Sequence, residues 1–173
     1  MGLMKNGLEL HSMFNFASSS GSLKYMQYPF RLKAFFWLNI VIPISNLIFG
    51  HTKSHWFGMG EPLPKKVGKQ WRKWCNGPGY VECELGSTIK DHIYGNLNIP
   101  SQWLYATDDG IANEKNVRDM IRVYPNLKYK VMELDPRKEG FEAIGHMGFF
   151  SKGKAPLWEY AIQWLAHNTN KAQ

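Results

Sequence analysis

IPSQWLYATDDG, residues 99–110, is the stretch that decides the fold. An apolar run that starts with a proline and stops at an Asp-Asp-Gly turn is typical of a buried strand. Asn113 then opens a helical pattern that closes at Tyr124-Pro125. Residues 128–134 alternate like a second strand. The chain therefore predicts a strand-helix-strand unit with two parallel strands. The helix should bury Val117, Met120, Ile121 and Tyr124, at i, i+3, i+4 and i+7.

An acid and a histidine stand just beyond these two strands. Asp108 and Asp109 follow the first strand, and His146 follows the loop after the second. Ligands of open α/β sheets bind at the carboxyl ends of the strands. A carboxylate there can accept the Nδ1 proton of an imidazole and fix its tautomer. Asp-Asp-Gly is also an ordinary turn, and a lone histidine is more often structural. Residue types alone leave both interpretations open.

Longer motifs add a family resemblance. ATDDGIAN at 106–113, followed by GHMGFF at 145–150, resembles the acid strand and histidine loop of an α/β-hydrolase. The motifs GMGEPLP, WRKWC and PGY, which begin at residues 58, 71 and 78, are similar to one bacterial subgroup of predicted serine hydrolases. The resemblance implies an acyl or ester hydrolase acting on a small-molecule substrate. It also implies Asp109, in preference to Asp108, as the acid and His146 as the base of a Ser-His-Asp catalytic triad.

The serine of that triad has no counterpart here. In α/β-hydrolases it lies on a Gly-x-Ser-x-Gly turn that precedes the acid and the histidine. No Gly-x-Ser-x-Gly occurs in the 173 residues. The resemblance places that turn before Met1, so it implies a fragment that is inactive alone. Ser18, Ser19 and Ser20, after a strand predicted at 13–17, are a remote alternative because a serine-rich turn is usually only a turn.

The predicted fold class is α/β: a partial α/β-hydrolase fold, with the C-terminal strands of a mostly parallel sheet, flanking helices and a helical lid-like insertion. Residues 1–24 and 96–173 are assigned to the core, and residues 25–95 to the lid or cap. A connection of that length must carry its own structure. The core assignment includes a helix end at Gly2–Leu10.

Two helices are expected in the insertion. Residues 34–49 are strongly apolar and fit either a lid over an apolar pocket or plain core packing. A membrane span needs about 20 predominantly apolar residues, so no transmembrane span is expected. Lys65–Trp74 is predicted as an amphipathic helix that buries Val67, Trp71 and Trp74.

The basic charge supports an alternative function. The chain has a formal charge of +7, and Lys69, Arg72 and Lys73 are interleaved with the aromatic residues of that helix. A non-catalytic module that binds anionic partners through this region fits the composition. No nucleic-acid recognition motif is present, so nucleic acid is not expected as a partner.

The remaining predictions concern compartment, cofactors and assembly. Cys75 and Cys83 lack ligand spacing, and no signal-peptide pattern is found, so free thiols in the cytoplasm are expected. His51 and His55 lack acidic or cysteine partners nearby, so no metal and no cofactor are expected. The edge of the strand at 13–17 is expected to be unpaired and to favour self-association.

The last helix is predicted to begin at Pro156 and to be followed by a polar tail at 168–173. Its apolar stripe should pack against the sheet and consists of Leu157, Trp158, Ala161, Ile162 and Leu165.

Overall fold

A computed structural model describes residues 10–57 and 60–169 of the chain. The helix predicted at Gly2–Leu10 lies outside the described residues, except for its last position. The main sheet contains β1 (Met13–Phe16), β4 (Pro100–Ala106) and β5 (Lys128–Leu134) in the order β1-β4-β5, and both pairings are parallel. The predicted parallel strand-helix-strand unit and the mixed α/β class are therefore confirmed.

The central strand β4 is buried on both faces. Pro100 is exposed where the strand begins, and the remaining six residues of β4 are all buried. Trp103 and Leu104 are only 2% and 1% exposed, as expected for a strand with a neighbour on each side and helices above and below. By contrast, β5 is mostly exposed and β1 is only partly buried. Within the described residues β1 and β5 are the two edges of this sheet.

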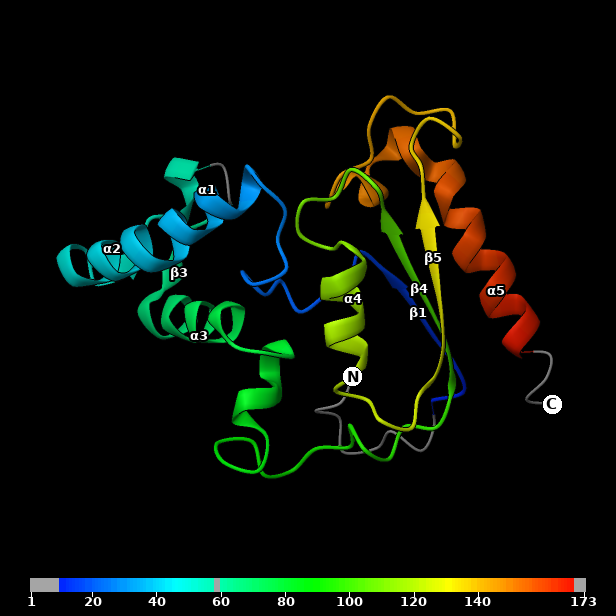
Figure 1. The fold of residues 1–173 in the computed structure, drawn as a ribbon, viewed down its shortest axis with the longest axis horizontal. Coiled ribbons are helices and arrows are strands. Elements are labelled where there is room, and N and C mark those ends of the chain that lie inside the picture. The colour runs from blue at the N-terminus through cyan, green and yellow to red at the C-terminus, as the bar shows by residue number, and fades with distance from the viewer. Residues whose placement is uncertain (1–9, 58–59, 170–173) are drawn as a thin grey trace.

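Helices α4 (Glu114–Ile121) and α5 (Glu159–Thr169) cover opposite faces of the sheet (Figure 1). Asn113 is the N-cap of helix α4, and its side chain accepts a hydrogen bond from the backbone N–H of Asn116. Its buried face contains Val117 and Ile121. The helix ends three residues before the predicted end, and Tyr124 is buried beyond it.

The predicted apolar stripe of the last helix is correct at Leu157, which is buried in the core, and wrong at three other positions. Trp158, Ile162 and Leu165 are 38%, 56% and 40% exposed. A 3₁₀ segment, η6 (Lys152–Trp158), contains Pro156, so the α-helix begins at Glu159 instead. Trp164 meets Phe14 of β1 edge-on at 5.8 Å. The later start and this aromatic contact determine which side of the helix faces β1.

The segment between β1 and β4 is largely helical. Helix α1 (Phe30–Phe36), a π-helical turn η2 (Trp37–Val41) and helix α2 (Ile42–Ile48) follow each other without a break. After them come the short strands β2 (His51–Thr52) and β3 (Leu63–Pro64), helix α3 (Lys65–Asn76), and the 3₁₀ segments η3 (Ser54–Phe57) and η4 (Tyr80–Glu84). These elements surround a second hydrophobic cluster, separate from that of the sheet, made of Leu23, Met26, Ala34, Trp37, Leu38, Ile42 and Cys75.

Helix α3 buries the predicted face only in part: Trp71 and Trp74 pack against the two hydrophobic clusters, as predicted. Val67 is 46% exposed, whereas Gly68 and Cys75 are buried. A Cβ atom at Gly68 would clash with Thr52 of β2 and would lie 3.3 Å from Asn46 of α2. The missing side chain lets α3 approach these two elements closely, so the buried face centres on a glycine that carries no hydrophobic signal in the sequence.

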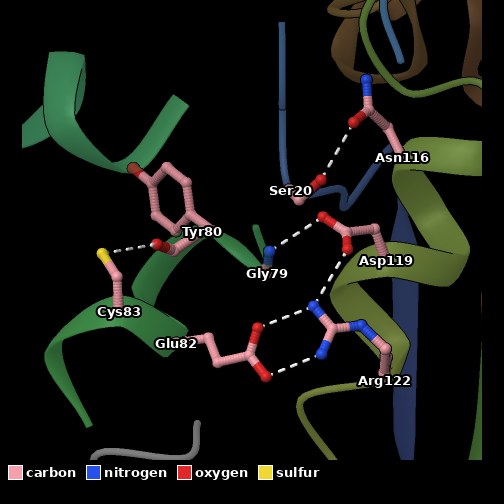
Figure 2. Close-up of polar contacts among 8 residues, drawn as sticks. All are labelled: Ser20, Gly79, Tyr80, Glu82, Cys83, Asn116, Asp119 and Arg122. Carbon is pink, nitrogen blue, oxygen red and sulfur yellow. Dashed lines mark hydrogen bonds and ion pairs between the residues drawn. The ribbon is translucent and has the colours of Figure 1, made fainter. Parts of the chain in front are cut away.

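Hydrogen bonds and ion pairs connect this helical region to helix α4 and the end of that helix (Figure 2). The backbone N–H of Gly79, beside η4, donates to the Asp119 carboxylate on α4 at 2.8 Å. Arg122 donates to both carboxylate oxygens of Glu82 at 2.6 Å and to Asp119 at 3.1 Å. Since Asp119 is buried, its carboxylate needs these donors.

Among the described residues, one helical stretch reaches the length and apolarity of a membrane span. It is Phe30–Ile48, with 19 residues and a mean hydropathy of 1.2. Core helices of soluble proteins meet the same two criteria, so the structure gives no clear transmembrane span.

Candidate active site

Three loops meet at the carboxyl ends of the three parallel strands. Residues 17–22 follow β1, residues 107–113 follow β4, and residues 135–147 follow β5. The first loop is hydrogen-bonded to α4, and the second to the third. Parallel strands place these ends at one edge of the sheet, where ligands of α/β folds bind.

The structure brings the two predicted site residues together. His146 Nδ1 lies 2.9 Å from Asp109 Oδ2. The other carboxylate oxygen, Oδ1, accepts hydrogen bonds from the backbone N–H groups of Ile111 at 2.8 Å and Ala112 at 2.9 Å. The Asp109 side chain has no exposed surface, while that of His146 is 34% exposed. The carboxylate is therefore fixed from one side by the backbone and presents its remaining oxygen to the imidazole.

Asp108 binds the backbone of the histidine loop instead of the imidazole ring. Its carboxylate accepts hydrogen bonds from the backbone N–H groups of Ile144 at 2.9 Å and Gly145 at 3.0 Å. Gly145 has a φ of +61°, a left-handed conformation that glycine adopts without strain. Asp108 thus holds the loop that carries His146, and Asp109 holds the ring itself. The preference for Asp109 as the partner of the histidine agrees with this geometry.

Ser20 is not placed as a free nucleophile. Its side chain is fully buried, and its hydroxyl donates to Asn116 Oδ1 at 2.9 Å (Figure 2). The same oxygen accepts the backbone N–H of Ser22 at 2.9 Å, and Asn116 Nδ2 donates to the carbonyl of Ile111 at 2.8 Å. The serine therefore helps to attach the loop after β1 to helix α4, and this explains its position without any chemistry.

A tyrosine near the end of β4 also uses its hydroxyl in a hydrogen bond between two strands. The Tyr105 hydroxyl donates to Glu133 of β5 at 2.6 Å. Burial, and secondly this bond, raise the pKa of Tyr105 above its ordinary value. It therefore remains a neutral donor and is not a candidate base at neutral pH.

The arrangement can move a proton at one defined atom. With Nδ1 bonded to Asp109, the Nε2 atom of His146 makes no hydrogen bond to any described residue. A neutral imidazole whose Nδ1 donates to a carboxylate has a basic Nε2. No group of three or more His, Cys, Asp or Glu side chains in the described ranges is arranged to hold a metal.

Sequence reasoning missed the residues that hold the site in place. Asn116 is buried and joins three backbone segments, yet an asparagine within a helix gives no distinctive pattern. The loop-holding role of Asp108 was also missed, although two adjacent acids after a strand were a visible signal. A further contact links the helical region to the acid turn: a Cβ at Gly110 would lie 3.2 Å from Phe30 Cγ. Such contacts depend on segments far apart in the sequence.

Comparison with known proteins gives no relative. No family model matches the chain, and neither a curated protein nor a solved structure matches it. Any assignment of function therefore depends on the residues and the geometry described above.

Proposed function

We propose that Asp109 and His146 are the acid and the base of a Ser-His-Asp acyl or ester hydrolase. The observation that carries this proposal is the contact of 2.9 Å between Asp109 Oδ2 and His146 Nδ1 at the carboxyl ends of parallel strands. The buried carboxylate, its two backbone donors and the partly exposed ring are what a positioned general base requires.

The proposed chemistry assigns one role to each residue. His146 Nε2 takes the proton of a serine hydroxyl as that oxygen attacks the substrate carbonyl, and the leaving group then receives this proton. Asp109 keeps Nδ1 protonated before the attack and stabilises the imidazolium that forms during it. Asp108 positions the loop without contacting the ring.

The nucleophile is proposed to come from outside these 173 residues. They contain no Gly-x-Ser-x-Gly, and the Ser20 hydroxyl is already donated to Asn116. A catalytic triad without its serine loses most of its rate enhancement. Residues 1–173 alone are therefore expected to turn over a short p-nitrophenyl ester no faster than buffer does. Turnover that disappears in His146→Ala would contradict this part of the proposal.

The ring itself offers a test that needs no serine. Nitrogen-15 NMR of the His146 side chain, recorded at a pH where the ring is neutral, should show the ring proton on Nδ1. In Asp109→Asn the amide can donate to Nδ1, and we expect the proton to move to Nε2. Asp108→Asn is the matched control and should leave the tautomer unchanged, because Asp108 bonds only backbone groups. An unchanged tautomer in Asp109→Asn would refute the proposed role of Asp109.

The DNA sequence upstream of the Met1 codon tests whether a nucleophile completes the site. If the proposal is correct, the reading frame upstream of the Met1 codon encodes a strand that ends in Gly-x-Ser-x-Gly. The protein that includes it should react with a fluorophosphonate at that serine, and His146→Ala should abolish the labelling. An upstream frame without such a turn would count against a hydrolase.

A further inference from the structure

The positive charge of the chain is concentrated in one segment. Residues 28–76 contain eight Lys and Arg residues and a single acid, Glu61, whereas the rest of the chain has 13 basic and 13 acidic residues. The whole formal charge of +7 therefore lies on the helical region built from α1, η2, α2 and α3. Among the described residues, Lys73 is the one cation of this segment that forms an ion pair, with Glu84 at 2.6 Å.

The same region has an apolar surface that the fold does not cover. One side of the continuous helix at 30–48 contributes to the second hydrophobic cluster, and the opposite side consists of large apolar residues open to solvent. Only 28% of its most apolar window is buried. We call the exposed side the outer face. Its residues are 40–83% exposed and are Leu32, Phe35, Phe36, Ile40, Ile44 and Leu47.

An aromatic and cationic group lies just past the end of this helix. Phe49 and Trp56 meet edge-on at 5.5 Å, and Trp56 is 61% exposed. The ammonium of Lys53 lies 4.8 Å from the centre of the Phe49 ring and 5.4 Å from the Trp56 ring. An exposed tryptophan beside a half-buried lysine suits the boundary between acyl chains and headgroups.

A hollow of about 210 Å³ connects the outer face to the cations of α3. Pro43 and Leu47 of α2 form part of its apolar wall, and Lys65, Lys69 and Arg72 border it at i, i+4 and i+7 along α3. Asn46 also lines the hollow. Three cations beside an apolar wall fit a phosphate attached to an acyl chain.

We propose that the helical region docks on an anionic phospholipid bilayer, with the outer face in the acyl region and Lys65, Lys69 and Arg72 at the phosphates. Apolar residues on one side and cations beside them are what an interfacial helix requires. The inner side of the helix at 30–48 packs against Leu23 and Cys75. The helix therefore lies along the bilayer surface and does not cross the bilayer. This inference does not depend on the proposed hydrolase function.

Two other binding partners, a second copy of the chain and a nucleic acid, fit this surface less well. A second copy placed symmetrically on the outer face would bring two segments of charge +7 together, and like charges oppose such a contact. A nucleic acid would neutralise the cations but would leave six large apolar residues in water. An anionic bilayer satisfies both features of the surface at once.

Vesicle flotation with the whole chain tests the proposal, with phosphatidylcholine vesicles compared with vesicles that also contain phosphatidylserine. We expect binding that needs phosphatidylserine and weakens with added salt. Replacing Lys65, Lys69 and Arg72 with Gln should weaken binding about fivefold for each charge. The matched control replaces Lys128, Lys130 and Arg137, on and after β5, and should change binding by less than twofold.

The apolar contribution is tested separately. Phe36→Ser with Leu47→Ser should lower vesicle binding by about tenfold or more. Leu47 is 83% exposed, so its replacement does not disturb the core. Ile162→Ser, at a 56% exposed position of α5, is the control and should bind like the parent protein. Circular dichroism identifies any variant that fails to fold, and Leu47→Ser alone then replaces the pair.

Each contrary result overturns the proposal. Absence of binding to phosphatidylserine vesicles does so directly. If the Ser variants bind vesicles normally but lose a dimer that sedimentation detects without lipid, the occupant is a second copy. If the Gln variants lose affinity for single-stranded RNA while vesicle binding is unaffected by the Ser variants, the occupant is a nucleic acid.

Discussion

Asn116→Ala is expected to be strongly destabilising, although Asn116 has no role in the proposed chemistry. The Asn116 side chain is fully buried and makes three hydrogen bonds, to the Ser20 hydroxyl, the Ser22 N–H and the Ile111 carbonyl. Each such bond contributes about 1 kcal/mol, so their loss costs about 3 kcal/mol. Alanine is a better helix former and returns roughly 0.5 kcal/mol. The net decrease in the free energy of unfolding should be about 2.5 kcal/mol.

Urea unfolding followed by circular dichroism measures this change. For a chain of this size we also expect the melting temperature to fall by about 5–10 °C. Asn126→Ala is the matched control, because Asn126 donates one exposed hydrogen bond, to the Gly95 carbonyl, and its loss should cost about 1 kcal/mol or less. If the two variants are equally stable, Asn116 does not hold the loop after β1 and the reasoning fails.

Four further predictions concern packing, thiol reactivity, the pH dependence of stability, and assembly. In an exposed helix, Gly68→Ala would raise the free energy of unfolding by roughly 1 kcal/mol. Here it should instead lower this free energy by about 1–3 kcal/mol in urea unfolding, because the added methyl group meets Thr52. A gain in stability would refute the close approach of α3 to β2. Iodoacetamide at pH 8 should modify the exposed Cys83 and spare Cys75, because burial raises the pKa of the Cys75 thiol to about 12. The unfolded chain ionises that thiol near its ordinary pKa, so the stability due to Cys75 should be lost as the pH rises above about 9, and Cys75→Ala should weaken this dependence in pH-dependent unfolding. The edge strand β1 should make the protein self-associate in size-exclusion chromatography, and a monomer that melts cooperatively would contradict this.

The sequence by itself determined the part of the fold that local patterns control. The apolar run into Asp-Asp-Gly marked β4, the residues at Lys128–Leu134 marked β5, and their parallel pairing followed from the helix between them. The same reasoning placed Asp109 and His146 at the ends of these strands, because parallel strands bring their carboxyl ends to one edge. Periodicity is a local property, and the parallel direction follows from the helical connection between consecutive strands, so a single sequence is enough to predict both.

Only the tertiary structure decided which helix faces are buried. Val67 was expected inside, but Gly68 lies against Thr52 and Asn46, because close approach of two elements favours the smallest residue over the most apolar one. The tertiary structure also assigned Asp108 to the loop and Asn116 to Ser20, through bonds across tens of residues. It left the outer face of the helix at 30–48 exposed. Burial depends on which distant segments come together, and hydrophobicity along one helix does not contain that information.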